Sequence, residues 1–175
     1  MSEITAQERA ARIKLLVLDI DGVLTDGRVV YDQDGRELKF FDIKDGHGLK
    51  LLQRAGFKIV WLSGRASKVN QVRAQELGID ELVEDCKIKL PRFERVLSEH
   101  GMQPEQAAFM GDDLIDLPPM RAAGLALAPA DAWPEVRQAA HWVATLPGGR
   151  GAVRQACELL LKASGKWDEV TGRYF

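Results

Sequence analysis

The sequence predicts an α/β fold in which a parallel sheet is covered by helices on both faces. Short apolar runs typical of buried strands alternate with longer amphipathic stretches, which is the pattern of successive βαβ units. A hairpin signal interrupts this alternation once. We therefore expect one domain over residues 1–175. The predicted strands are Lys14–Asp19, Lys58–Leu62, Glu81–Glu84, Ala107–Met110, Leu125–Ala128 and a weaker Trp142–Val143.

Helical periodicity fills the intervals between these strands. The clearest case is Val153–Ala163, where apolar residues recur at spacings of three and four and so mark one buried face. The other predicted helices are Gly48–Arg54, Ala66–Leu77, Leu90–Glu99, Leu114–Ala122 and Glu135–Ala139.

An inserted hairpin is predicted over Arg28–Phe41, directly after the first strand. Two β-rich runs flank the turn Asp32–Gly35, and such a turn between such runs favours a hairpin. A two-stranded hairpin cannot bury all the apolar side chains that this one carries. We therefore expect it to contact another subunit, together with the mixed polar and aromatic tail Gly165–Phe175.

Composition excludes several classes of protein. Lys and Arg total 24 against 26 Asp and Glu, so the chain lacks the basic charge of a typical nucleic-acid binder. Its only cysteines, Cys86 and Cys157, are too few for a disulfide scaffold and favour a reducing compartment. Met1–Arg12 shows no signal-peptide pattern, and the apolar run Leu15–Leu18 is too short to span a membrane. We expect a soluble cytoplasmic protein.

Acidic residues follow two of the predicted strands. Asp19 and Asp21 come after the first strand, and Asp112, Asp113 and Asp116 follow Ala107–Met110. The carboxyl ends of parallel strands share one edge of a sheet, where such folds bind ligands. So many carboxylates at one edge repel each other unless a hard cation such as Mg²⁺ lies between them. The pattern therefore predicts a Mg²⁺ or phosphoryl site.

Other polar residues follow strand ends too. Ser63 ends the second predicted strand and either binds an anion with the following helix amides or caps that helix. Arg65 can pair with an acidic substrate group. Lys89 precedes a predicted helix, but a lone lysine is usually solvated, and Lys87 is an alternative for the same position.

In this order the residues resemble the four motifs of the haloacid dehalogenase superfamily of phosphohydrolases. The first motif is Asp19–Gly27, the second centres on Ser63, the third is Lys89 and the fourth is Gly111–Asp116. The resemblance implies a Rossmann-like fold. It also implies a capless member, because no interval between the motifs holds a further domain.

A closer resemblance is to the small phosphatases of 3-deoxy-D-manno-octulosonate 8-phosphate, the KdsC family. It rests on Leu24–Gly27, the hairpin, Asp42–Gly46 and Gly148–Val153. The resemblance implies a homotetramer whose hairpins and tails complete neighbouring active sites. It implies a small-molecule substrate, a sugar-acid phosphate of lipopolysaccharide biosynthesis, with no nucleic-acid or membrane partner.

The same resemblance implies the catalytic roles. Asp19 is the nucleophile that forms an aspartyl phosphate, and Asp21 is the general acid and base. Mg²⁺ is held by Asp19, the Asp21 backbone carbonyl and Asp112, while Ser63 and Lys89 bind phosphoryl oxygens. We expect Asp113 and Asp116 to position Lys89 or metal-bound waters. The implied substrate contacts are Asp21, Asp42, Ile43, Lys44, Asp45, Gly46, Lys50, Arg65, Arg73 and Lys89.

Three other functions stay open at this point. The chain could hydrolyse a sialic-acid or other nonulosonate phosphate, because the motif residues would be the same. A non-catalytic assembly module of this fold is a second alternative, although all the acidic motif positions are present. A receiver domain is the third, but it does not need the Asp19–Asp21 pair after its first strand.

Overall fold

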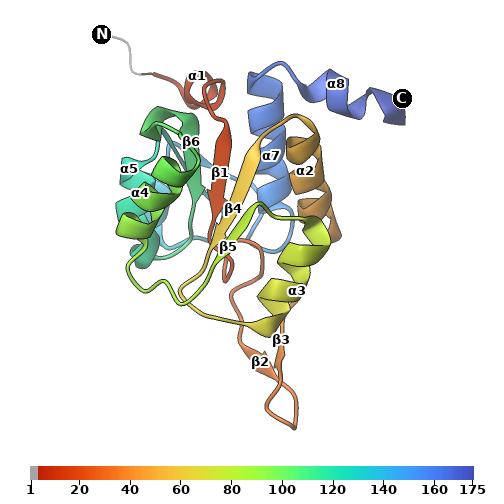
Figure 1. Cartoon of the computed structure of the whole chain (residues 1–175), viewed down its shortest axis with the longest axis vertical. Helices are drawn as coiled ribbons and strands as arrows, with labels where there is room; N and C mark the ends of the chain where they lie inside the picture. The colour runs from red at the N-terminus through yellow and green to blue at the C-terminus, as the bar shows by residue number, and fades with distance from the viewer. Residues whose placement is uncertain (1–3) are drawn as a thin grey trace.

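Six parallel strands form the central sheet of the computed structural model, which describes residues 4–175 (Figure 1). Their order is β5-β4-β1-β6-β7-β8. The chain moves from β1 towards β5 and then returns past β1 to β6, so β1 and β6 meet where the winding direction reverses. Such a reversal opens a crevice at the carboxyl ends of the two strands. The strands are β1 (Leu15–Leu18), β4 (Lys58–Leu62), β5 (Glu81–Val83), β6 (Ala107–Met110), β7 (Leu125–Ala128) and β8 (Trp142–Val143).

Helices cover both faces of the sheet, as the alternation predicts. Leu16 and Leu18 pack in a cluster with α2 and α7, while Leu15 and Val17 pack in a second cluster with α4 and α5. Alternate residues of β1 thus face opposite sides of the sheet, and both sides are covered by helices, so the strand is apolar throughout. The helices are α1 (Ala6–Ala10), α2 (Ile43–Arg54), α3 (Lys68–Leu77), α4 (Lys89–Glu99), α5 (Leu117–Ala122), α6 (Pro134–Ala139), α7 (Ala152–Ala163), α8 (Trp167–Thr171) and the 3₁₀ turns η1 (Pro104–Gln106), η2 (Leu114–Asp116) and η3 (Gly172–Tyr174).

Helix boundaries differ from the prediction where capping decides them. Helix α2 begins at Ile43 rather than Gly48, because the Asp42 side chain accepts a hydrogen bond from the Lys44 amide and caps it. Two glycines in its first turns hide that start from periodicity. Helix α3 begins at Lys68, and its cap is Ser67 rather than Ser63.

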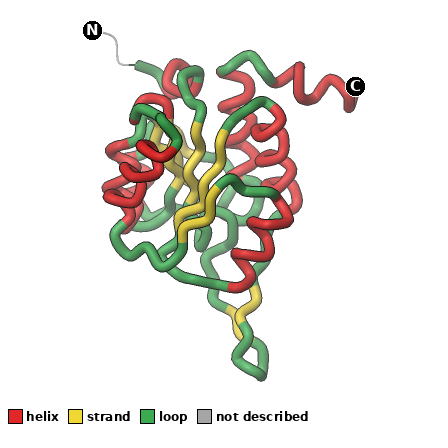
Figure 2. The backbone as a smooth tube through the Cα atoms, viewed as in Figure 1, coloured by secondary structure: helices red, strands yellow, loops and turns green. Residues whose placement is uncertain are grey.

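The hairpin projects from the edge at which the strands end, and helix α1 and the C-terminus lie at the opposite end (Figure 2). Its strands are β2 (Val30–Tyr31) and β3 (Glu37–Leu38), paired antiparallel. Phe40 is 69% exposed and Tyr31 is 58% exposed. Such exposed apolar side chains are typical of a surface that meets another chain.

The tail is helical and lies on its own chain. The Tyr174 hydroxyl bonds His47 and Arg54 of α2, and the Lys162 ammonium lies over the Trp167 ring. Both cysteines are free. No helix among residues 4–175 has the length and apolar character needed to cross a membrane.

Candidate active site

The crevice between β1 and β6 brings the two acidic motifs together. Leu18 and Met110 are partners in the sheet, so Asp19 and Asp112 follow neighbouring strand ends. Oxygens of Asp19, Asp112 and Asp116 all lie within 4.8 Å of one another. Gly22 has φ +102°, and a Cβ at this position would overlap the Asp112 carboxylate. Position 22, where the loop of the first motif passes the Asp112 carboxylate, therefore requires glycine.

Lys89 is buried beside these acids. Its Nζ donates to Oδ1 of Asp19 and to Oδ1 of Asp116, each at 2.6 Å, and its side chain has no exposed area. Lys87, the alternative, is exposed and donates to the Gly64 carbonyl. Because Lys89 opens α4, the helix start fixes its side chain in the crevice. The geometry thus distinguishes the two lysines that the sequence left open.

Both carboxylate oxygens of Asp116 accept hydrogen bonds from other groups of the protein. While its Oδ1 accepts from Lys89, its Oδ2 accepts from the backbone amides of Asp112 and Asp113. Both oxygens are therefore engaged by protein donors. The Asp113 side chain accepts from the Leu114 amide and caps η2. This arrangement leaves Asp19 and Asp112 as the carboxylates available for a cation.

Burial of several acids around one lysine perturbs their titration. Burial raises the pKa of Asp19 to about 6, with Lys89 lowering it and Asp116 raising it. Burial, followed by the charges of Asp19 and Asp116, raises the pKa of Asp112 to about 8. Burial alone would lower the pKa of Lys89, but the two acids outweigh it and raise that pKa. The site as built thus has too little positive charge for its carboxylates.

These residues fit a divalent cation. Oδ1 of Asp112 is buried and has no hydrogen-bond partner within the described chain. An orphaned buried carboxylate oxygen is costly, and a hard cation that prefers oxygen ligands would satisfy it. The predicted ligands Asp19 and Asp112 therefore suit a cation, while the Asp21 carbonyl stays a prediction.

A cavity of about 290 Å³ opens directly onto Asp19 and Asp21. Arg65 reaches it from the end of β4, and Ser63 lies buried beside it with its hydroxyl accepting from the Arg65 amide at 3.1 Å. The remaining lining residues are Gly27, Val29, Gly64, Asp112, Asp113 and Ile115. The cavity thus combines the acid pair Asp19 and Asp21 with the guanidinium of Arg65, and it is open to solvent.

Two residues of the hairpin contact this site, and the sequence analysis missed both. The Lys39 ammonium donates to Oδ1 of Asp21 at 2.6 Å, and Arg65 donates to Oε1 of Glu37 at 2.9 Å. Glu37 and Lys39 are two residues apart and so share one side of the extended chain. The spacing of Glu37 and Lys39 is visible in the sequence, but the partners of these two side chains depend on how the hairpin folds back onto the site.

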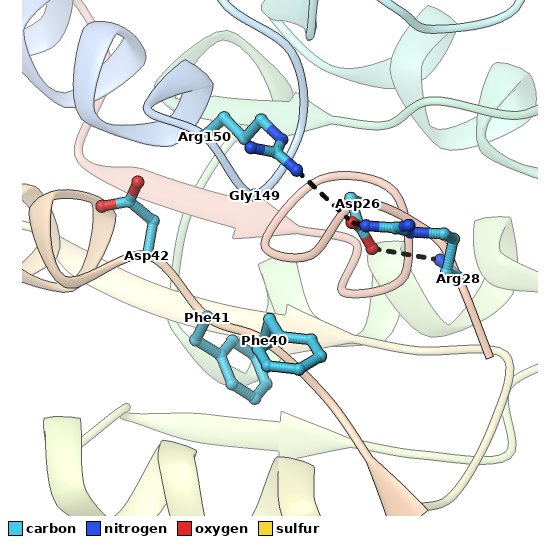
Figure 3. A pocket seen from close by; sticks show the side chains of 7 residues that line it. All are labelled: Asp26, Arg28, Phe40, Phe41, Asp42, Gly149 and Arg150. Atoms are coloured by element: carbon cyan, nitrogen blue, oxygen red, sulfur yellow. Dashed lines mark hydrogen bonds and ion pairs between the residues drawn. The ribbon is translucent and has the colours of Figure 1, made fainter. Parts of the chain in front are cut away.

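Asp42 lines a neighbouring cavity of about 360 Å³ between the hairpin stem and the loop before α7. Figure 3 shows the Asp26 carboxylate between Arg28 and Arg150, with the rings of Phe40 and Phe41 across the cavity from them. The loop that carries Asp26 and Arg28 also carries Gly27, which lines the Asp19 cavity. The two cavities are therefore neighbours on one loop.

The other predicted substrate contacts lie away from Asp19 within a single chain. Asp45 is buried and accepts from the amides of Gly151 and Arg154. Lys50 donates to the Leu77 carbonyl, while Arg73 pairs with Glu76 and packs against Gly46. Ile43 and Lys44 are exposed at the start of α2. These positions stay predictions.

Comparison with known proteins supplies the relatives of this chain. No protein-family model matches it. A protein of Yersinia pestis called 3-deoxy-D-manno-octulosonate 8-phosphate phosphatase KdsC is 42% identical over 165 residues, which cover 94% of this chain and 88% of that protein. Its crystal structure matches with a TM-score of 0.91 over 93% of this chain and 88% of its own.

A phosphatase with the same description from Moraxella catarrhalis was solved in complex with magnesium, phosphate and KDO. It is 34% identical and matches with a TM-score of 0.95 over 97% of this chain and 98% of its own. With this degree of identity over nearly its whole length, the chain belongs to the KdsC family of phosphatases within the haloacid dehalogenase superfamily.

Proposed function

We propose that this chain is a Mg²⁺-dependent phosphatase that hydrolyses 3-deoxy-D-manno-octulosonate 8-phosphate to the free sugar acid and phosphate, a step in lipopolysaccharide sugar biosynthesis. The observation that carries the chemistry is the buried Lys89, which bridges Asp19 and Asp116 beside the orphaned oxygen of Asp112. The names of the relatives support the choice of substrate.

In this proposal Asp19 attacks the phosphorus and forms an aspartyl phosphate, and the sugar oxygen leaves. Lys89 holds the Asp19 carboxylate in one orientation and, with Ser63, neutralises phosphoryl oxygens as charge spreads over them. Asp21 gives a proton to the leaving oxygen and then takes one from the water that hydrolyses the intermediate. Both aspartates line the same cavity, as this sequence of steps requires.

Mg²⁺ would be held by the carboxylates of Asp19 and Asp112 and by the backbone carbonyl of Asp21. When bound, it supplies the positive charge that lets an anionic nucleophile approach an anionic phosphate. Burial, followed by the charges of Asp19 and Asp116, raises the pKa of Asp112 to about 8, and such a cation would offset the charge of these carboxylates.

Substrate selectivity would come from cations around the two neighbouring cavities and from a second chain. Arg65 lines the Asp19 cavity and suits the carboxylate of a sugar acid. Because Ile43 and Lys44 are exposed on their own chain, these two would serve a neighbouring subunit in a homotetramer. The exposed hairpin supports such an assembly. We also infer one catalytic domain and a cytoplasmic location, which the two free thiols support.

The test is phosphate release from a panel of sugar phosphates with and without Mg²⁺. The panel holds 3-deoxy-D-manno-octulosonate 8-phosphate, a nonulosonate 9-phosphate and glucose 6-phosphate. The proposal expects the first to have the highest kcat/KM, and only with Mg²⁺. A higher value for the nonulosonate phosphate would reassign the substrate, and no hydrolysis of any ester would refute the activity.

A further inference from the structure

The hairpin brings a buried lysine against the acid-base aspartate. Nζ of Lys39 lies 2.6 Å from Oδ1 of Asp21, and the Lys39 side chain is 2% exposed. The Asp21 side chain is 23% exposed and faces the reaction cavity. Two residues earlier, Glu37 pairs with Arg65, so one side of the returning arm of the hairpin, residues 37–39, meets two charged groups of the site.

Burial sets Lys39 apart from the other cations of the hairpin. The side chains of Arg28 and Arg36 are 70% and 76% exposed, and each pairs with an acid close to it in sequence. An ammonium group taken out of water is costly unless a partner compensates it, and ordering a long side chain adds an entropic cost. Among the described residues, the carboxylate that compensates the buried Lys39 ammonium is that of Asp21.

The geometry indicates what that bond does. Proton transfer to a leaving oxygen requires the donor group within hydrogen-bond reach and correctly turned. Lys39 bonds Oδ1 of Asp21, which fixes the rotation of the carboxyl group and leaves Oδ2 for the substrate. Asp21 lines the Asp19 cavity, and Lys39 is not among the described residues that do, so a substrate in that cavity would meet Asp21 rather than Lys39.

We propose that Lys39 is a positioning residue that orients the Asp21 carboxyl group for proton transfer to the leaving oxygen, and that the hairpin thereby becomes part of the catalytic apparatus. This inference rests on the proposed phosphatase function. It differs from a role for Lys39 in substrate binding or in merely holding the hairpin to the body of the protein.

The test exploits the need of the leaving group for a proton. The alkoxide of a sugar is a poor leaving group that needs protonation, whereas the nitrophenolate of p-nitrophenyl phosphate leaves without it. Three variants are compared with wild type on both esters: Lys39→Met, Lys39→Arg as the conservative change, and Arg36→Met as a hairpin control. Light scattering checks that the variants keep the wild-type molar mass.

For Lys39→Met we expect kcat on the sugar phosphate to fall about 10- to 100-fold, a part of what general acid catalysis typically contributes. On p-nitrophenyl phosphate, kcat/KM reports the steps up to release of nitrophenolate, before Asp21 acts as a base, and it should change less than about 3-fold. KM for the sugar phosphate should stay within about 3-fold. Lys39→Arg should keep more activity on the sugar phosphate than Lys39→Met, and Arg36→Met should match wild type.

Other outcomes overturn the inference. An equal fall of kcat/KM on both esters would assign Lys39 a structural role, and a higher KM for the sugar phosphate with unchanged kcat would assign it to substrate binding. Unchanged kinetics would remove it from the reaction. A wild-type protein inactive on both esters would instead refute the phosphatase function itself, so the two failures are distinguishable.

Discussion

The buried carboxylate of Asp45 makes the stability of this protein depend on pH in a specific way. Asp45 lies on α2 but accepts from the Gly151 amide at 3.2 Å and from the Arg154 amide at 2.7 Å, at the start of α7. Gly151 is the N-cap position of α7 and has no side chain to cap it. Asp45 therefore caps α7 from another helix.

Burial is the main cause that raises the pKa of Asp45 to about 6, while its two backbone bonds lower it. A carboxyl whose pKa is 3.8 in the unfolded chain and about 6 in the folded one binds more protons when folded. Its contribution to stability is therefore greatest below pH 3.8 and falls as the pH rises to 6. The change is worth about 3 kcal/mol at most.

The perturbation is Asp45→Asn, which keeps the shape and removes the titration. Urea unfolding of both proteins between pH 4 and 7.5, without divalent cations, gives the free energy of unfolding of each. The stability of wild type minus that of the variant should fall by about 2–3 kcal/mol from pH 4 to pH 7. Since Asp19 and Asp112 titrate in both proteins, their contributions cancel. A difference that stays constant, or that grows with pH, would refute the reasoning.

Three further outcomes follow from the site and from the expected assembly. Lys89→Ala should lower kcat by about 10³-fold or more, because it leaves the buried acids Asp19 and Asp116 without their ammonium partner. Lys87→Ala should stay within about 3-fold of wild type, because Lys87 is exposed. The reverse result would mean that Lys87, not Lys89, is the lysine of the third motif. Chelation should abolish phosphate release and Mg²⁺ should restore it, since the Asp112 oxygen otherwise lacks a partner; full activity after exhaustive chelation contradicts the metal site. Deletion of Trp167–Phe175 should raise KM for the sugar phosphate without abolishing hydrolysis of p-nitrophenyl phosphate, and light scattering of wild type should give a tetramer; a fully active monomer would contradict the shared site.

Local pattern was enough to predict the sheet and to place the acidic residues at one edge of it. Buried strands such as β1 are continuous apolar runs, and the residues that end them must lie at the carboxyl edge whatever the loops do. Asp19 and Asp112 are therefore placed by topology, whereas Lys89 was predicted only from the resemblance to the family motif; the structure brings all three together. Lys87 could be set aside only once the start of α4 was known.

Contacts between distant segments could not be predicted in the same way. The partner of Lys39 depends on the path of the hairpin, and the partner of Asp45 depends on how α2 packs on α7. Helix α8 lies in a short polar tail whose order comes from contacts such as that of Tyr174 with α2 rather than from periodicity. The predicted contacts at Lys50 and Arg73 bond within their own chain here, so their role toward a substrate stays a prediction.

The most direct test of the central claim compares wild type with Asp19→Asn in phosphate release from 3-deoxy-D-manno-octulosonate 8-phosphate at saturating Mg²⁺. The amide keeps nearly the same shape but cannot attack phosphorus, so the variant should fold like wild type by circular dichroism. The account predicts a loss of at least about 10⁴-fold in kcat. A variant that keeps even a tenth of wild-type turnover would contradict the aspartyl-phosphate mechanism.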